Sequence, residues 1–470
     1  MKSKLSLLLL ASAAALVSCG GGDATSTSIF SRRSIESWEN KYAGTATETC
    51  NLTIWAGESN DSVEFVKMVA KDFKAANPQS NYNITIKPVS ESSVSGDWEQ
   101  NPSTAADLAI AADDQIPAMV SSDRLVSLEQ LSKKQIPGLK DDIVGRSLPE
   151  AIEAVTQNDN VYAFPISASN GFVLYYNAKY LKAEDTVSFD KLLEAIHKVS
   201  ETAGRNLTFG YPYNSGWYLD GWFHGAGLTA VGNAGDTYVT CNWNNTDEKA
   251  GNLGKDVAGA MVKLAHGQYK AHWSADTSNK LMTRIADGST NEVVATISGT
   301  WDYNRLVKAW GEGNAKASVL PKYHLDLANK DVQMNSVKGF KVAIINKNKT
   351  NIVASARFAE FMANYESQVL RYDMLNEAPA NMQARELVIN AQSNPVVKAI
   401  NDQWDTSFVE KVNQSFWGPS NGLSVQLSAN DAETAKYVVS GEGTANVVLN
   451  YDEIQSALDA CINKLGPAAE

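Results

Sequence analysis

The chain has 470 residues, of which 44% are hydrophobic and 20% are charged, the balance of an ordinary globular protein. Its length exceeds what one small hydrophobic core can hold and suits two lobes or domains. Its formal charge of −12 argues against nucleic acid or an anionic membrane surface as the main partner, because either would require a basic face.

An apolar run opens the chain and ends at a cysteine. Two lysines precede the almost wholly apolar stretch 5–16, and Ser18 leads into Cys19. The run is too short to span a bilayer, which requires about 20 apolar residues, so it predicts a signal peptide over 1–18. A small residue before the cysteine resembles the lipobox of bacterial lipoproteins. This resemblance implies lipidation of Cys19 and an extracytoplasmic protein, anchored to a bacterial membrane at the cell surface or in the periplasm.

Residues 19–49 are rich in Gly, Ser, Thr and Ala and lack periodicity, which predicts a flexible tether between the lipid and the folded body. Three further cysteines, Cys50, Cys241 and Cys461, lie far apart in the sequence. They form no CxxC pair and no Cys/His spacing suited to zinc, so we expect no metal and no cofactor. At most one disulfide could join them, and the sequence leaves open which pair, if any.

Strand and helix patterns alternate from Asn51 onward. Residues 52–56 predict a strand, the apolar residues of 63–73 recur at helical spacing, and further strands are predicted at 82–86 and 107–111. A strand–helix–strand order implies parallel pairing with right-handed crossovers. The sequence therefore predicts an α/β fold.

The remainder of the chain continues this mixture. Strands are predicted at 172–176, 293–297 and 336–345, and helices at 191–199 and 255–264. The last predicted helix has Ile454, Leu458, Cys461 and Leu465 on one face, so we expect Cys461 in the core.

Five short segments are informative through their order and spacing. They are Leu52-Thr53-Ile54-Trp55-Ala56-Gly57, residues 107–114, Tyr162-Ala163-Phe164-Pro165-Ile166 with Leu174-Tyr175-Tyr176-Asn177, Ile297-Ser298-Gly299-Thr300-Trp301, and Gly339-Phe340. Together they resemble the extracellular solute-binding proteins of ABC importers, in particular the maltose-binding protein group. The resemblance spans about 51–345.

The resemblance implies a two-lobe clamshell of the periplasmic-binding-protein type II, with a hinge between the lobes and the ligand in the cleft. It implies a first lobe over 50–167 and 338–376 and a second lobe over 168–337 and 377–470. The chain would cross between the lobes near 165–169, 337–339 and 376–381.

A sugar ligand has hydroxyls, which need donors and acceptors, and apolar C–H faces, which pack on aromatic rings. Polar side chains that follow strands facing the cleft are therefore candidates for contact with the hydroxyls. These candidates are Glu58, Asn60, Asp113, Asp114 and Asn170. The candidates for stacking, taken from the resemblance and from their loop-like surroundings, are Trp217, Tyr218, Trp301, Tyr303 and Trp417.

The resemblance implies a receptor that binds a carbohydrate and delivers it to the membrane subunits of an ABC permease, and we expect a monomer without enzymatic activity. Peptides and polyamines are alternative ligands, since the chain after residue 18 has 39 basic and 53 acidic side chains, a balance of −14. A surface glycoside hydrolase is another alternative, because carboxylates beside aromatic rings also describe its site. The sequence has no nucleophile elbow, HExxH motif or Gly-rich phosphate loop, and we assign no catalytic residue.

Overall fold

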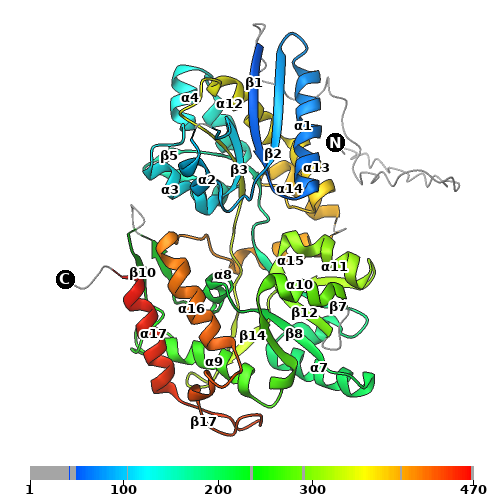
Figure 1. Cartoon of the computed structure of the whole chain (residues 1–470), viewed down its shortest axis with the longest axis vertical. Coiled ribbons are helices and arrows are strands. Elements are labelled where there is room, and N and C mark those ends of the chain that lie inside the picture. Colours follow the sequence, from blue (N-terminus) through cyan, green and yellow to red (C-terminus); the bar gives the residue numbers. More distant parts are fainter. Residues whose placement is uncertain are drawn as a thin grey trace, which may run out of the picture.

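The computed structural model describes residue 42 and residues 49–466, apart from 103, 233–236, 288–291 and 392–393. These residues form two bodies that follow one another along the long axis of the molecule (Figure 1). Each body contains a five-stranded sheet with helices packed around it, which confirms the predicted two-lobe α/β fold. The predicted signal peptide and Cys19 lie outside the described residues. Within the described part of the chain, no helix has the length and apolarity needed to cross a membrane.

The first lobe is built on a sheet with the strand order β2-β1-β3-β16-β6. Its strands are β1 (Thr49–Ala56), β2 (Asn81–Pro88), β3 (Leu108–Ala112), β16 (Lys341–Ile345) and β6 (Phe164–Ser167), and a small hairpin is formed by β4 (Thr156–Gln157) and β5 (Asn160–Val161). Its helices are α1 (Asn60–Ala76), α2 (Val94–Gln100), α3 (Ile116–Ser121), α4 (Leu128–Lys134), α5 (Leu139–Arg146), α6 (Pro149–Ala154), α12 (Ile352–Met362), α13 (Tyr365–Leu375) and α14 (Met382–Ala391). Strand β1 pairs in parallel with β2 and β3, as the strand–helix–strand order predicts, while β16 runs antiparallel to β3 and β6.

The second lobe is built on a sheet with the order β11-β8-β12-β7-β13. Its strands are β7 (Phe172–Asn177), β8 (Leu207–Pro212), β11 (Trp273–Asp276), β12 (Glu292–Gly299) and β13 (Ala315–Ser318), with hairpins β9 (Ala230–Gly232) and β10 (Val239–Cys241), β14 (Lys322–Leu325) and β15 (Lys330–Gln333), and β17 (Val438–Ser440) and β18 (Val448–Leu449). Its helices are α7 (Phe189–Ala203), α8 (Gly216–Gly225), α9 (Gly254–His266), α10 (Ser278–Asp287), α11 (Tyr303–Trp310), α15 (Pro395–Asp402), α16 (Trp417–Ser428) and α17 (Tyr451–Leu465). Strand β8 pairs in parallel with β11 and β12, while β7 is antiparallel to β12 and β13.

Helix α1 shows how the local sequence positions one edge of the cleft between the lobes. The hydroxyl oxygen of Ser59 caps the helix by accepting a hydrogen bond from the backbone N–H of Ser62 at 3.1 Å. Phe65, Val69 and Phe73 lie on its buried face, one or two turns apart, and anchor it in the first core. Only residues 57–59 separate β1 from α1, so the helix begins at the edge of the sheet where the strand ends.

Each lobe has its own hydrophobic core. The core of the first lobe combines residues of 52–168 with residues of 340–380. The sheet of the second lobe has one hydrophobic cluster that includes Phe209 and Trp222 and another that includes Leu306. The predicted amphipathic C-terminal helix is confirmed as α17, and Cys461 is buried in the second lobe as expected.

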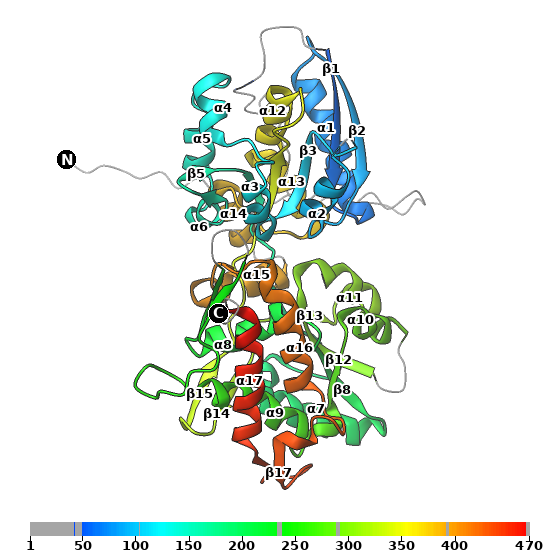
Figure 2. The ribbon, with the colours of Figure 1, turned by 60° about the vertical axis from the view of Figure 1, so that its left-hand side comes forward.

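In the part of the chain that the structure describes, the backbone passes between the lobes at three places. Residues 168–171 join β6 to β7, and residues 334–340 join β15 to β16. The third passage lies between α14 and α15, because α14 packs on α13 whereas α15 packs on β13 and β7 (Figures 1 and 2). This differs from the expected crossing at 376–381 and moves 377–391 into the first lobe, where the N–H of Leu148 also donates to the carbonyl of Ala380.

The first two crossings lie against each other at two glycines. The N–H of Asn170 donates to the carbonyl of Gly339 at 3.0 Å. A Cβ atom on Gly339 would lie 2.2 Å from the carbonyl oxygen of Asn170, and one on Gly171 would lie 2.6 Å from that of Val337. Glycine is therefore required here by the close approach of two backbones. The same crossing explains why the strand predicted over 336–345 begins only at Lys341.

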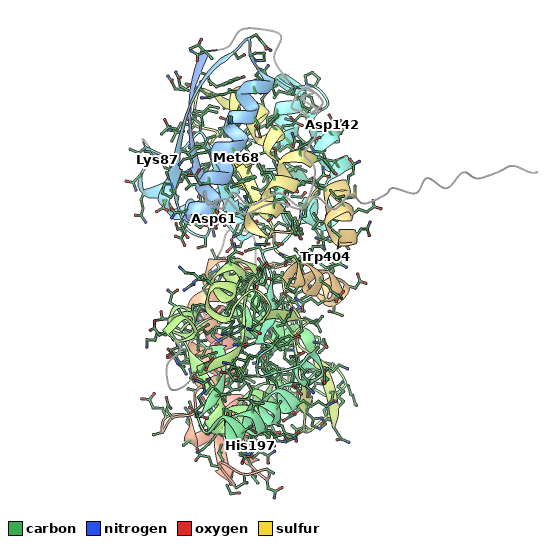
Figure 3. The ribbon with its side chains drawn as sticks, turned by 90° about the vertical axis from the view of Figure 1, so that its right-hand side faces the viewer. Asp61, Met68, Lys87, Asp142, His197 and Trp404 are labelled. Atoms are coloured by element: carbon green, nitrogen blue, oxygen red, sulfur yellow. The ribbon has the colours of Figure 1, made fainter. Side chains whose placement is uncertain are left out.

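A further contact between the lobes is made by Trp404, which lies at their junction (Figure 3). Its indole N–H donates to Oε1 of Glu150, in α6 of the first lobe, at 3.2 Å. The guanidinium of Arg385 lies 4.4 Å from the ring centroid, and the ammonium of Lys338 lies 5.2 Å from it. Two cations and a hydrogen bond therefore hold this ring between the lobes.

Candidate ligand-binding cleft

A cavity of about 800 Å³ lies between the two lobes, within the size range of pockets that enclose small molecules. The first lobe lines it with residues that follow β1 and β3, among them Glu58 and Asp114. The second lobe lines it with residues that follow β8 and β12, among them Trp217 and Trp301. Both lobes thus offer the carboxyl ends of their strands, where sites in α/β proteins form.

Three of the described residues that line the cavity are tryptophans, Trp217, Trp301 and Trp417. The ring centroids of Trp217 and Trp301 are 5.7 Å apart, with 31° between the ring planes. Trp301 is 49% exposed, although its ring is one of the largest apolar side chains. A Cβ on Gly299 would lie 2.2 Å from that ring, so glycine lets the indole fold back over the end of β12. The two rings therefore present apolar surface to the cavity.

Trp217 is held in place by a carboxyl group and by a neighbouring ring. Its indole N–H donates to Oε2 of Glu410 at 2.9 Å, and its ring packs edge to face on Phe172 at 4.7 Å. Glu410 also lines the cavity. Its other oxygen, Oε1, is buried and has no hydrogen-bond partner among the described residues, so the carboxyl group retains acceptor capacity.

The carboxyl groups of Asp113, Asp114 and Glu410 share a desolvated region beside the cavity. Burial, and after it the charge of Asp114, raises the pKa of Asp113 to about 7. Burial also raises the pKa of Asp114. Burial, followed by the charges of Asp114 and Asp113, raises the pKa of Glu410 well above its usual range. All three carboxyl groups therefore bind protons more tightly than carboxyl groups in water do.

Two buried cations balance other carboxylates on the side of the first lobe. Nζ of Lys341 lies 2.9 Å from Oε2 of Glu91, and Nε of Arg371 donates to Oε2 of Glu377 at 2.8 Å. Burial alone would raise the pKa of Glu91, but Lys341 and Arg371 stabilise the carboxylate and lower its pKa. Burial alone would lower the pKa of Lys341, but Glu91 beside it raises this pKa. The Glu91–Lys341 pair is therefore ionised.

The second lobe contributes one further ion pair. Nη1 of Arg305 donates to Oδ1 of Asp302 at 2.8 Å, and the hydroxyl of Ser298 donates to Oδ2 of the same carboxylate at 2.6 Å. Asp302 and Arg305 both line the cavity. Among the described residues, no three His, Cys, Asp or Glu side chains are arranged so that they could hold a metal ion.

Seven of the ten residues expected at the site line this cavity. They are Glu58, Asp114, Asn170, Trp217, Tyr218, Trp301 and Trp417. These seven residues come from six segments that are distant in the sequence, and only the adjacent Trp217 and Tyr218 share a helix. The structure thus brings together the two kinds of side chain, aromatic and polar, that a sugar requires.

The other three expected residues lie outside the lining. Oδ1 of Asp113 instead accepts a hydrogen bond from the backbone N–H of Phe340 at 3.1 Å, behind the cavity wall. Asn60 is the exposed first residue of α1, and its neighbour Asp61 lines the cavity instead. The ring of Tyr303 is stacked on Tyr175, with 6.4 Å between centroids. A turn places successive side chains in different directions, which sequence spacing alone does not resolve.

Sequence reasoning also missed several residues of the lining, above all Glu410 and Lys341. Glu410 belongs to no sequence motif. It reaches the cavity because its segment pairs with the second crossing, residues 334–340, where the N–H of Lys338 donates to the carbonyl of Phe408. Lys341 offered a usable signal, since it is the one charged residue of the apolar stretch 339–345. A lone charge in a buried strand needs a partner, and Glu91 is that partner.

Comparison with known proteins agrees with this architecture. The maltooligosaccharide ABC transporter solute-binding lipoprotein of Streptococcus pneumoniae (strain ATCC BAA-255 / R6) is 23% identical over 416 residues, which cover 83% of this chain and 88% of that protein. Among solved structures, the maltodextrin-binding protein MalE1 from L. casei BL23 without ligand is similar with a TM-score of 0.69 at 20% identity, over 89% of this chain and 99% of that one. The maltose-binding protein MalE from Listeria monocytogenes in complex with maltose has a TM-score of 0.62 at 17% identity, over 90% of this chain and 99% of that one.

At these identities the solved structures show likeness of the fold alone. The family assignment rests on a separate finding, a match of residues 68–399 to the family model of bacterial extracellular solute-binding proteins. This match covers well over half of the chain and includes parts of both lobes. The chain therefore belongs to the bacterial extracellular solute-binding protein family.

Proposed function

We propose that the protein is the extracytoplasmic receptor of an ABC importer and binds a carbohydrate in the cleft between its lobes. The observation that carries this proposal is the position of two indoles, the half-buried Trp217 and the exposed Trp301, beside the carboxyl groups of Asp114 and Glu410 around one cavity. Support also comes from the relative in Streptococcus pneumoniae, whose name assigns it to the transport of maltooligosaccharides.

The chemistry of the lining suits a solute with many hydroxyl groups. The apolar C–H faces of sugar rings would stack on Trp217 and Trp301, while Glu58, Asn170 and Arg305 offer acceptors and donors for hydroxyls. A dissociation constant in the micromolar range corresponds to about 8 kcal/mol, which two stacked rings and several hydrogen bonds can supply.

The two lobes give the receptor a means of signalling that it is loaded. A solute drives closure only through contacts that are better in the closed state, and a solute in this cavity would touch both lobes. The segments 168–171 and 334–340 are the candidate hinges, since the first joins the two five-stranded sheets and the second joins the β14–β15 hairpin of the second lobe to the sheet of the first. The closed form would then deliver the solute to the permease subunits.

The proposal includes lipidation of Cys19 and action as a monomer. Replacing the sulfur acceptor in a Cys19→Ser variant should release the protein from the membrane fraction of the cells that express it. Size-exclusion chromatography with light scattering should give the mass of one chain. A Cys19→Ser protein that remains with the membranes would contradict the anchor, without affecting the assignment of the cleft.

Isothermal titration of the purified protein with maltooligosaccharides and other oligosaccharides tests the central proposal. We expect saturable binding of at least one saccharide and its recovery at unchanged length by chromatography. A shortened saccharide would identify a glycoside hydrolase instead. Binding of a peptide or a polyamine, with no saccharide bound, would contradict the carbohydrate assignment.

A further inference from the structure

The cavity between the lobes is strongly acidic. Of the described residues that line it, seven are acidic and two, Arg305 and Lys341, are basic. Both cations already have a carboxylate partner, Asp302 at 2.8 Å and Glu91 at 2.9 Å. The lining therefore has five more carboxyl groups than cations.

This excess is concentrated at Asp114 and Glu410. Asp114 follows β3 of the first lobe, whereas Glu410 follows α15 of the second, so each lobe contributes one of these carboxyl groups to the lining. The cation that acts on Asp114 is Lys341, whose ammonium is already paired with Glu91. Asp113 adds a third carboxyl group, whose charge also acts on Glu410. Desolvated carboxylates are costly unless a proton or a cation neutralises them.

The protonation of this group reflects the same cost. Burial and mutual repulsion raise the pKa of Asp113 and of Glu410, and burial raises that of Asp114. A cation placed among them would stabilise the ionised forms and displace the protons. A neutral hydroxyl could form a hydrogen bond with these carboxyl groups, but it would not reduce the repulsion between their ionised forms.

The neighbouring indoles add a second feature that favours a cation. Trp217 donates its N–H to Glu410, and its ring faces that of Trp301 at 5.7 Å. The ammonium of Lys341 lies 5.9 Å from the centroid of the Trp301 ring, so this face already accommodates an ammonium group. Carboxylates and the faces of indoles are the two protein groups that attract ammonium ions most strongly.

Building on the carbohydrate-binding role proposed above, we infer that the solute carries a protonated amine besides its hydroxyl groups, as amino sugars and amino-substituted oligosaccharides do. The ammonium lies between Asp114 and Glu410, and the sugar rings stack on Trp217 and Trp301. The area of two indoles favours a ring-bearing amine over a thin polyamine chain, which would leave much of that apolar surface uncovered.

Three kinds of probe test this inference by isothermal titration at pH 7. They are maltotriose, maltotriose with one hydroxyl replaced by an amine at C2, C4 or C6, and the N-acetylated, uncharged form of each amine. We expect one amine to bind about tenfold more tightly than its neutral counterparts, the scale of a charge-assisted hydrogen bond. Because the ammonium displaces protons, titrations in buffers of different ionisation enthalpy should also detect proton release.

Variants assign the preference to the named carboxyl groups. Glu410→Gln and, independently, Asp114→Asn should bring the ratio of the affinity for the amine to that for maltotriose down to about one, whatever their effect on the affinity for maltotriose itself. Asp405→Asn, which removes an exposed carboxylate outside the cavity, should leave the preference unchanged and serves as the matched control. Two separate variants keep the test decisive if one of them folds poorly.

The outcomes separate this inference from the carbohydrate role. Equal affinity for the amine and its neutral counterparts, or a preference that survives both variants, would overturn the inference and leave the carbohydrate role intact. Binding of spermidine with no saccharide bound would overturn both. A preference that is lost in Glu410→Gln and kept in Asp405→Asn would establish the amine site.

Discussion

The ammonium of Lys341, in the first lobe, lies 5.9 Å from the ring centroid of Trp301, in the second. The same ammonium pairs with Glu91 at 2.9 Å. One charge thus interacts with a carboxylate on its own side and with the face of an indole across the cavity. A solute that stacks on Trp301 must replace the second of these contacts and can leave the first in place.

Removing the ammonium should cost stability, because it leaves Glu91 without its nearest cation. Lys341→Met leaves Glu91 as a buried charge with only Arg371 nearby, and we expect a loss of about 3 kcal/mol in the free energy of unfolding. The double variant Lys341→Met with Glu91→Gln should recover most of it. Urea unfolding at pH 7 measures both, and equal midpoints for the single and double variants would show that the pair contributes nothing.

The cost of Lys341→Met should shrink in acid. Because the pKa of Glu91 is lower in the folded protein than in the unfolded chain, its contribution is present above the usual pKa of 4.5 and is lost as the pH falls through the folded value. The urea midpoints of the native protein and the variant should converge below that pH. A constant gap across the titration would mean that the ion pair is not the source of the loss.

The indoles should carry much of the affinity for the saccharide. Trp301→Ala and Trp217→Ala should each weaken binding by about 1–3 kcal/mol, the scale of an aromatic contact that is lost. Leu327→Ala removes a side chain that is 48% exposed in the second lobe but lies outside the cavity lining, and it should bind as the native protein does. Titration calorimetry, with circular dichroism to verify folding, makes the comparison.

The carboxyl group of Asp113 should make stability depend on pH. Its pKa is raised to about 7 from a usual value of 3.8, so the stability that it supports is complete below pH 3.8 and declines as the pH rises through 7. Asp113→Asn keeps an acceptor for the N–H of Phe340 and removes the titration. Between pH 5 and pH 8 the stability of the variant should therefore fall by less than that of the native protein. Thermal unfolding of both proteins at pH 5 and at pH 8 measures this difference.

The close approach of the first two crossings predicts a contrast between two glycines. Gly339→Ala places a Cβ atom 2.2 Å from the carbonyl oxygen of Asn170 and should cost about 1–3 kcal/mol in stability. Gly96→Ala, in α2, meets no atom within 4 Å and should be neutral or gain about 0.5–1 kcal/mol, as alanine does within a helix. If the two variants unfold at the same urea concentration, the crossing tolerates movement that the structure does not indicate.

Much of the fold could be predicted from the sequence because its signals are local. The apolar spacing of 63–73 and the strand patterns at 52–56 and 82–86 correspond to α1, β1 and β2. The third crossing lies between α14 and α15, not at the predicted 376–381. The sequences of α13 and α14 both have helical patterns, and no local signal shows on which lobe a helix packs. Leu148 and Ala380, whose backbones bond, are too distant in the sequence for their contact to be anticipated.

The lining residues that come just after strands could be predicted from the sequence, and the others could not. Glu58, Asp114 and Trp301 are each the second residue after a strand, and all three line the cavity. Glu410 reaches the cavity through the pairing of a late segment with a crossing, and its role depends on Trp217, almost two hundred residues earlier in the chain (|i−j| = 193). Contacts of that range follow from the tertiary fold.

The strand order of the first sheet has a consequence for the order in which the nascent chain can fold. Strand β16 lies between β3 and β6, so both of these strands lack their shared neighbour until residue 345 has been synthesised. By that time all five strands of the second sheet have been synthesised, and that sheet can assemble first although it comes later in the sequence. Until then the exposed edges of β3 and β6 are open to pairing with other chains, which makes this interval the one in which a chaperone would matter most.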